Sequence, residues 1–173
     1  MADQVVVIKL PGKPKTPDVK KKDKPDFQWI TARLALGGAI ESEEMAQAIA
    51  DAGVTAVLNV RTNQDEVPWV HAAKMAYMSS PTKDEDEDHK KPEWFQASAD
   101  FIRSQMSKPQ GKLLVHCQGG QNRSPAIVYF YLRTLGFDSD TCENFITTAR
   151  PEAKGEMAWN DDADRALKKL GYT

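Results

Sequence analysis

One short segment holds residue types that can bind an anion and attack it. Its sequence is His116-Cys117-Gln118-Gly119-Gly120-Gln121-Asn122-Arg123-Ser124. The apolar residues before Cys117 predict a buried strand, the two glycines predict a tight turn, and Ser124 followed by Pro125 predicts the start of a helix. Backbone N–H groups of such a turn converge on one point, and the helix N-terminus adds unpaired donors and the positive end of a dipole. The segment therefore predicts a cup that binds an oxyanion.

A nucleophile and a cation share this cup. Positive dipoles and cations favour the thiolate form of a cysteine, so we expect Cys117 to react as a thiolate. Arg123 can hold two oxygens of a phosphate through its planar guanidinium. A thiolate below a phosphoryl group, with an arginine that neutralises the oxygens, is what in-line transfer to sulfur requires. Ser124 can stabilise the sulfur when it leaves in a second step, and we expect His116 to orient the loop by hydrogen bonding.

The elements that must position this segment follow from the hydrophobic pattern. Period-two and period-3.6 segments alternate after Phe27, which predicts a single α/β domain in which helices alternate with buried strands. The expected strands cover residues 30–36, 56–61, 75–79 and 112–117. The expected helices run from Ser42 to Gly53, from near Pro92 through Met106, from Ser124 to Gly136, and over residues 139–149 and 160–170.

Composition limits the class of protein. The 173 residues carry 23 Lys and Arg against 25 Asp and Glu, for a formal net charge of −2. This balance gives no general attraction for nucleic acid or anionic lipid. The two cysteines are too few for a disulfide framework, and no apolar run approaches the roughly 20 residues that cross a bilayer. We therefore expect a cytoplasmic monomer with no membrane or nucleic-acid partner.

The amino-terminal stretch differs from the rest of the chain. Residues 1–26 are rich in Lys and Pro and have little apolar surface, so we expect a flexible tail or linker before a catalytic domain at 27–173. His71 and His89 have no partners at metal-ligand spacing, which predicts no metal site. Cys142 shares a helical face with Phe145 and Ile146, which predicts a packed core residue.

The order His-Cys, five residues, Arg-Ser resembles the signature of cysteine-dependent protein tyrosine phosphatases. The size of the chain is similar to that of the dual-specificity branch of this superfamily. The resemblance covers most of the chain after Phe27 and includes residues 94–102 before the loop and Arg150-Pro151 after it. It implies a central mixed, mostly parallel sheet flanked by helices. It also implies hydrolysis of phosphomonoesters through a phosphocysteine intermediate, without metal or cofactor. Many relatives carry Ala at the position of Gly119, a difference that we expect to change little.

The resemblance also implies a general acid. In this family an Asp on a mobile loop before the cysteine protonates the leaving oxygen. Residues 83–89 read Lys-Asp-Glu-Asp-Glu-Asp-His and hold several candidates. Counting back from the helix at Trp94, we favour Asp86 over Asp84, with Asp88 third.

The loop residues also bear on the substrate. We expect the phosphate to be bound by Gln118, Gly119, Gly120, Gln121, Asn122 and Arg123. Phosphatases of polyphosphoinositides resemble this loop but add Lys to it, so a singly phosphorylated ligand fits better. We favour phosphotyrosine and phosphoserine or phosphothreonine in proteins, with inhibition by oxyanions such as vanadate. A lipid phosphatase, an RNA 5′-triphosphatase, which the Asn-Arg pair resembles, and a non-catalytic phosphoprotein-binding module stay open as alternatives.

Overall fold

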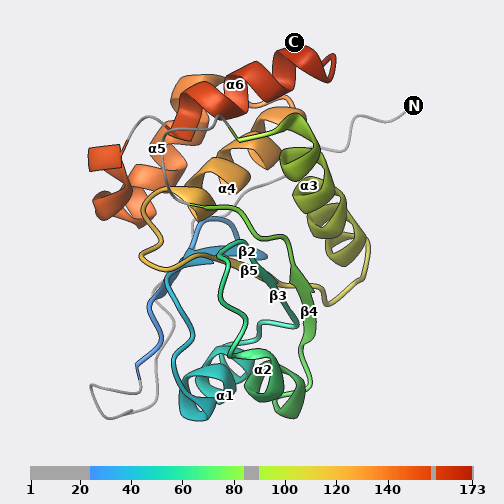
Figure 1. Ribbon diagram of the computed structural model, residues 1–173, viewed down its shortest axis with the longest axis vertical. Coiled ribbons are helices and arrows are strands. Elements are labelled where there is room, and N and C mark those ends of the chain that lie inside the picture. Colours follow the sequence, from blue (N-terminus) through green and yellow to red (C-terminus); the bar gives the residue numbers. More distant parts are fainter. Residues whose placement is uncertain (1–23, 84–89, 157–158, 173) are drawn as a thin grey trace.

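A five-stranded sheet lies between two groups of helices (Figure 1). The computed structural model describes residues 24–83, 90–156 and 159–172. Helices α1 (Glu43–Asp51) and α2 (Val67–Ala72) lie on one face of the sheet. The opposite face carries the remaining helical elements, which are α3 (Pro92–Met106), α4 (Arg123–Thr134), α5 (Ser139–Ala149), the 3₁₀ helix η2 (Pro151–Glu156) and α6 (Trp159–Lys169).

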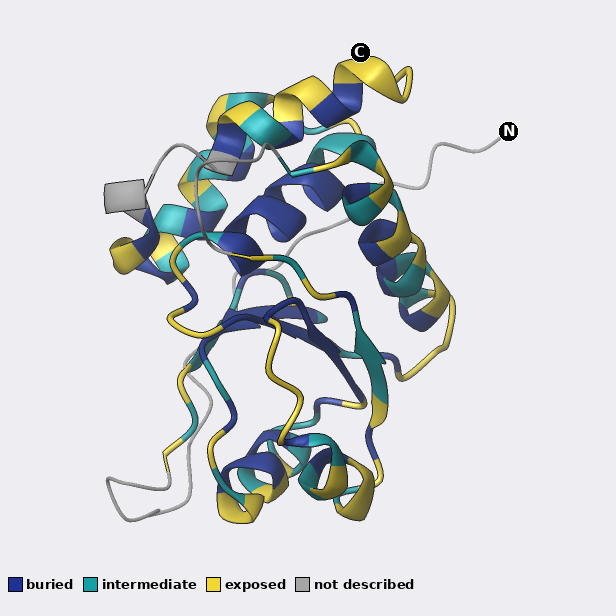
Figure 2. Ribbon diagram, viewed as in Figure 1, coloured by how far each residue is buried: buried dark blue, intermediate teal, exposed yellow. Residues whose placement is uncertain are grey.

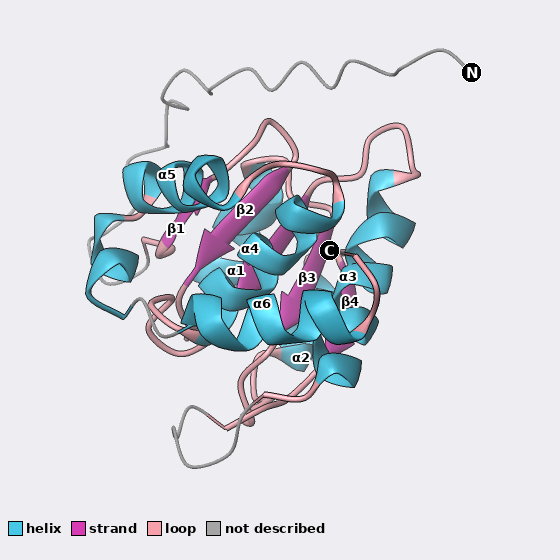
Figure 3. Ribbon diagram, turned by 90° about the horizontal axis from the view of Figure 1, so that it is seen from above, coloured by secondary structure: helices cyan, strands magenta, loops and turns pink. Residues whose placement is uncertain are grey.

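The sheet is mixed and mostly parallel, as the family resemblance implies. The strands are β1 (Phe27–Trp29), β2 (Leu34–Gly37), β3 (Ala56–Asn59), β4 (Ala76–Ser79) and β5 (Leu113–His116). Their order is β1-β2-β5-β3-β4, and only the β1–β2 pair among them is antiparallel. Figure 3 shows the strands from the side that the second group of helices covers.

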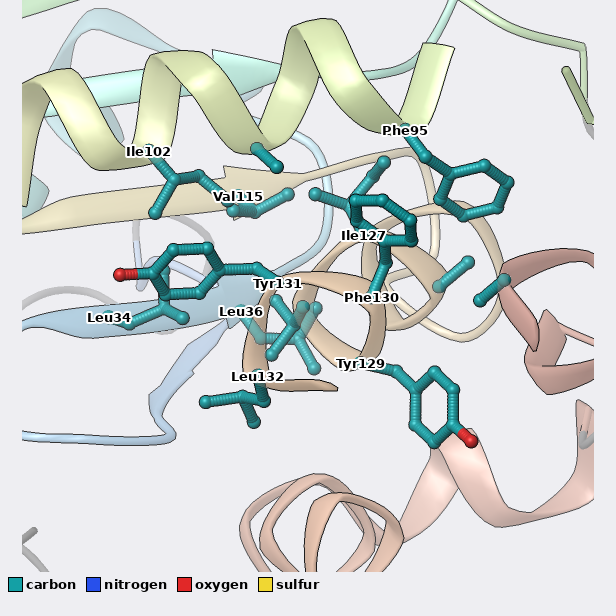
Figure 4. Close-up of a cluster of buried hydrophobic side chains, with 14 of the residues drawn as sticks. Leu34, Leu36, Phe95, Ile102, Val115, Ile127, Tyr129, Phe130, Tyr131 and Leu132 are labelled. Carbon is teal, nitrogen blue, oxygen red and sulfur yellow. The ribbon is translucent and has the colours of Figure 1, made fainter. Parts of the chain in front are cut away.

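Side chains of the strands alternate between two cores. Residues such as Leu36, Leu58 and Val115 face the larger cluster under α3 and α4, whereas their neighbours Val57 and Leu114 face the smaller cluster under α1 and α2. Figure 4 shows the larger cluster, and Figure 2 shows that α4 is buried along most of its length. Full burial of one such large apolar side chain stabilises the fold by about 1.5–3 kcal/mol.

The register of the sheet places the carboxyl end of β5 in the middle. Gly37 of β2 and Asn59 of β3 both pair with His116 of β5. Residues that directly follow the parallel strands lie just beyond the carboxyl ends of these strands. α/β proteins bind their ligands in this region. Cys117 directly follows β5 and therefore lies at this edge.

Local sequence signals explain most element boundaries. The Ser42 hydroxyl accepts a hydrogen bond from the Met45 amide at 3.1 Å and caps α1, and α3 begins at Pro92. The helix expected over 160–170 is α6, which begins and ends one residue earlier. Within the described residues, no helix is long and apolar enough to cross a membrane.

One expected strand is wrong. Residues 30–36 do not form a continuous strand, because the chain reverses at 30–33 between β1 and β2. The Thr31 hydroxyl accepts hydrogen bonds from the amides of Arg33 and Leu34, at 3.2 and 3.0 Å, and stabilises this turn. The sequence analysis also did not foresee β1 or the short helix α2.

Candidate active site

The loop that follows β5 surrounds the sulfur of Cys117. This side chain is buried, with 2% of its surface exposed. The Gly120 amide donates to Sγ at 3.2 Å, and the Ser124 Oγ lies 3.2 Å from Sγ. The same hydroxyl lies 3.2 Å from the Gly37 carbonyl, which also accepts from the Cys117 amide at 3.3 Å. The one hydroxyl proton can therefore serve the carbonyl or an anionic sulfur.

Arg123 is the first residue of α4, and its guanidinium is directed to the segment after β4. Its Nη1 donates to the Thr82 carbonyl at 3.1 Å, and the side chain is almost fully buried. The Thr82 amide in turn donates to the Val60 carbonyl, which ties this segment to the end of β3. Arg123 therefore links the loop to the chain directly before the acidic run.

The candidate general acids belong to the segment between β4 and α3. Asp84, Asp86 and Asp88 lie at 84–89, outside the described residues. The described residues on either side are anchored, since Trp94 Nε1 donates to the Ser80 carbonyl at 2.8 Å. The choice of Asp86 over Asp84 stays a prediction.

Arg150 forms hydrogen bonds to backbone carbonyls of the loop. Its Nε and Nη2 donate to the carbonyls of Gly120 and Gly119, each at 2.8 Å. The same guanidinium pairs with Asp26 at 2.9 and 2.7 Å, and its Nη1 donates to Gln28 of β1 at 2.7 Å. The C=O and N–H of a trans peptide point in opposite directions, so this contact turns the following amides away from Arg150. The Gly120 amide that contacts the sulfur is one of them.

The two glycines of the loop have different tasks. Gly120 has φ +67°, and a Cβ there would lie 2.6 to 2.7 Å from the Arg150 guanidinium. Only glycine fits that position without strain. A Cβ on Gly119 would meet nothing nearer than Gln121 at 3.9 Å, so the position has room for alanine.

A second buried network contacts the start of the loop. His116 Nδ1 lies 3.0 Å from the Cys117 carbonyl, and Nε2 lies 3.0 Å from Glu66 Oε1. Glu66 Oε2 accepts from Arg61 Nη2 at 2.9 Å, and Arg61 Nη1 donates to Gln118 Oε1 at 2.9 Å. Arg61 is 5% exposed, so its ion pair with Glu66 is buried beside the loop.

Titration in this network follows from burial and charge. Burial raises the pKa of Glu66, but the hydrogen bond and charge of His116, a backbone hydrogen bond and Arg61 together outweigh it and hold the pKa below its usual value. Burial raises the pKa of Tyr77 to about 12, aided by Glu66 and opposed by the Asn59 hydrogen bond. The carboxylate is therefore ionised and the phenol neutral near pH 7.

The other cysteine is placed as the sequence predicts. Cys142 is fully buried in the larger core and forms no disulfide. Burial raises the pKa of its thiol to about 12, so it is not a thiolate at neutral pH.

The structure brings most of the expected site together. Residues 116–124 form one loop and helix start around the sulfur, and the side chains of Gln118 and Gln121 are exposed at its surface. Sequence analysis missed Glu66, which contacts His116 directly, and it missed Asp26 and Gln28, which are linked to the loop through Arg150. It noted Arg150-Pro151 as a feature shared with the phosphatase family and assigned no role to Arg150.

Comparison with known proteins identifies the family. The family model described as "Dual specificity phosphatase, catalytic domain" matches residues 36–160, which is more than half of the chain. The chain belongs to the dual-specificity phosphatase family. Mouse dual specificity protein phosphatase 1 is 33% identical over 126 residues, which cover 70% of this chain and 32% of that protein.

Further relatives agree with this family. Bovine dual specificity protein phosphatase 26 is 53% identical over 38 residues, which cover 22% of this chain and 18% of that protein. The chain thus spans about a third or less of the curated relatives it matches. The crystal structure of human DUSP28 superposes with a TM-score of 0.70 at 22% identity and covers 86% of this chain and 97% of that one. The dual-specificity phosphatase fold is therefore present nearly in full.

Proposed function

We propose that this dual-specificity phosphatase removes phosphate from phosphotyrosine and from phosphoserine or phosphothreonine in proteins through a phosphocysteine at Cys117. The observation that carries the proposal is the sulfur beneath the loop, 3.2 Å from both the Gly120 amide and the Ser124 hydroxyl. A phosphate in the loop would sit directly above this sulfur. Amide donors and Arg123 would stabilise the oxygens in the transition state.

The proposed first step transfers the phosphoryl group to sulfur. The Cys117 thiolate attacks phosphorus, an S–P bond forms, and the P–O bond to the leaving group breaks. The leaving oxygen takes a proton from an acid of the 84–89 run, for which we propose Asp86 with Asp84 as the alternative. No metal or cofactor takes part in this scheme.

The proposed second step releases phosphate. Water attacks phosphorus, loses a proton to the same carboxylate, and the S–P bond breaks. Ser124 donates to the departing sulfur at this point, because its hydroxyl proton can turn from the Gly37 carbonyl to the thiolate. The Cys117 thiolate and the protonated general acid are restored at the end of this step.

The substrate class follows from the charge of the loop. Residues 118–124 contain a single basic residue, Arg123, which suits one phosphate group. The partners we propose are phosphoproteins, with vanadate as an inhibitory oxyanion. We also propose that the protein is cytoplasmic, in line with its two unpaired cysteines. A monomer is the oligomeric state that we propose.

The test is turnover of p-nitrophenyl phosphate. We expect activity that persists in EDTA, falls with vanadate and disappears in Cys117→Ser. Rates on a phosphotyrosine peptide, a phosphothreonine peptide, a phosphoinositide and triphosphate-ended RNA then distinguish the substrate classes. Stoichiometric phosphopeptide binding without turnover would instead support a binding module and contradict the proposed enzyme.

A further inference from the structure

Glu66 is a fully buried carboxylate that the proposed mechanism does not use. It lies at the start of α2, in the segment between β3 and α2. Its Oε1 accepts from His116 at 3.0 Å and from the Tyr77 hydroxyl at 3.2 Å, and its Oε2 accepts from Arg61 at 2.9 Å. A buried charge is costly unless it is paired, so this carboxylate depends on its cationic partners and they depend on it.

The partners of His116 determine its protonation. Nδ1 faces the Cys117 carbonyl and Nε2 faces the Glu66 carboxylate, each at 3.0 Å. A carbonyl and a carboxylate only accept hydrogen bonds, so both ring nitrogens must donate. Only the imidazolium form carries two N–H groups. The geometry therefore places a positive charge on the residue next to Cys117.

A second path leads from Glu66 to the loop. Arg61 Nη2 donates to the other carboxylate oxygen, and Arg61 Nη1 donates to Gln118 Oε1, each at 2.9 Å. Glu66 is therefore linked through His116 to residue 117 and through Arg61 to residue 118. Arg150 contacts the two glycines that follow in the same loop.

We propose that Glu66 is a positioning residue of the phosphatase: it keeps His116 charged and Arg61 in place, and so fixes the first two loop residues and favours the Cys117 thiolate. The activity readout of this proposal rests on the proposed function. The charged and titratable groups that contact the pair, within the described part of the chain, are Arg61 after β3, Tyr77 on β4 and the Cys117 residue. Arg123 of α4 adds the loop's own cation.

The test compares Glu66→Gln with Asp65→Asn. Asp65 also pairs with Arg61 Nη2, at 2.8 Å, but it is 57% exposed and has no hydrogen bond to His116 among those described. In Glu66→Gln we expect the pH midpoint of Cys117 alkylation by iodoacetamide, located by mass spectrometry, to rise. We expect kcat/KM for p-nitrophenyl phosphate to fall about 10- to 100-fold, the range that loss of catalytic positioning produces. Asp65→Asn should leave both unchanged.

Two further measurements separate positioning from folding. The ¹⁵N shifts of His116 in the wild-type protein at pH 7 should show both ring nitrogens protonated, and Glu66→Gln should shift them to the neutral pattern. Glu66→Asp keeps the charge and should bring the alkylation midpoint back towards the wild-type value.

The proposal is overturned by a neutral His116 in the wild type, by an unchanged alkylation midpoint in Glu66→Gln, or by equal effects of the Asp65 and Glu66 variants. Alkylation and ¹⁵N shifts need no turnover. They therefore decide this proposal even if Cys117→Ser shows that the proposed enzyme activity is wrong.

Discussion

Arg150 is a buried guanidinium whose donors are divided between the loop and the start of the sheet. Two of its contacts fix loop carbonyls, and the others reach Asp26 and Gln28. Because the amides of the loop are expected to bind the phosphate, the orientation of these carbonyls bears directly on catalysis. Arg150 would act on the substrate through the loop, as a positioning residue.

Replacing Arg150 by lysine should show this effect. Arg150→Lys keeps the charge but loses the planar fork that reaches two carbonyls and a carboxylate. We expect kcat/KM to fall about 10- to 100-fold, because small displacements of a catalytic group carry such a cost. Arg103→Lys, in a partly exposed pair with Asp100, is the control and should keep full activity. If the Arg150→Lys enzyme is as active as the wild type, the loop keeps its conformation without the guanidinium, and this account is contradicted.

Gly120 offers a matched comparison with Gly136. Both have positive φ, at +67° and +97°, but a Cβ on Gly136 would meet nothing within 4 Å. Alanine at either position carries a backbone strain of about 1–3 kcal/mol. Gly120→Ala must in addition displace Arg150, so we expect a larger loss of stability in urea unfolding and a strong loss of activity. Equal stability losses with full activity in Gly120→Ala would contradict this account.

At the scale of elements, the β1–β2 hairpin supports the site. The Gly37 carbonyl at the end of β2 accepts from both the Cys117 amide and the Ser124 hydroxyl. The segment before β1 approaches closely here, since the Gly38 amide donates to the Asp26 carbonyl at 2.9 Å. A truncation meant to remove the expected tail should therefore keep Asp26.

Replacing Gly37 by alanine should push β2 away from the start of β1. Its Cβ would lie 2.3 Å from the Asp26 carbonyl oxygen and 2.7 Å from the Phe27 Cβ, so backbone must move. We expect a loss of about 1–3 kcal/mol in unfolding free energy, as for overpacked positions, together with lower kcat. Gly119→Ala, with room for its Cβ, is the stability control. A Gly37→Ala protein as stable as this control would show that the hairpin tolerates the displacement.

The same elements show what the sequence can predict. Ser42 and Pro92 mark their helix starts through local chemistry, and the apolar run before Cys117 marks β5. The turn at 30–33 was missed because the Thr31 hydroxyl breaks a run that otherwise has strand composition. Helix α2 has six residues and shows too little periodicity to predict.

At the scale of the molecule, the site depends on contacts between distant parts of the chain. The loop was predictable because its residues are contiguous in the sequence, and because the spacing of the cysteine, glycines and arginine is that of an anion-binding turn with a nucleophile. Its supports were not, since Glu66 lies 50 residues from His116 and Asp26 lies 124 residues from Arg150. Such partners come together only through the strand order of the sheet, which local periodicity does not specify.

Global stability should depend on acid pH through Glu66. Its pKa in the folded protein is below the ordinary value of 4.5, so the ionised form stabilises the fold above pH 4.5 and this contribution is lost as the pH falls through the folded pKa. We expect the difference in unfolding free energy between wild type and Glu66→Gln to shrink from pH 6 to pH 3.5. Urea titrations at each pH measure it. A difference that is constant with pH would mean that folding does not lower the pKa of Glu66, which would contradict this account.

The most direct test of the central claim is to trap the covalent intermediate. Ser124→Ala removes the donor to the departing sulfur, so the second step should slow and the phosphoenzyme should accumulate. After mixing this variant with a ³²P-labelled phosphotyrosine peptide and quenching in acid, we expect near-stoichiometric label on the peptide that contains Cys117. Label on another residue, or turnover with no label on Cys117, would contradict the account.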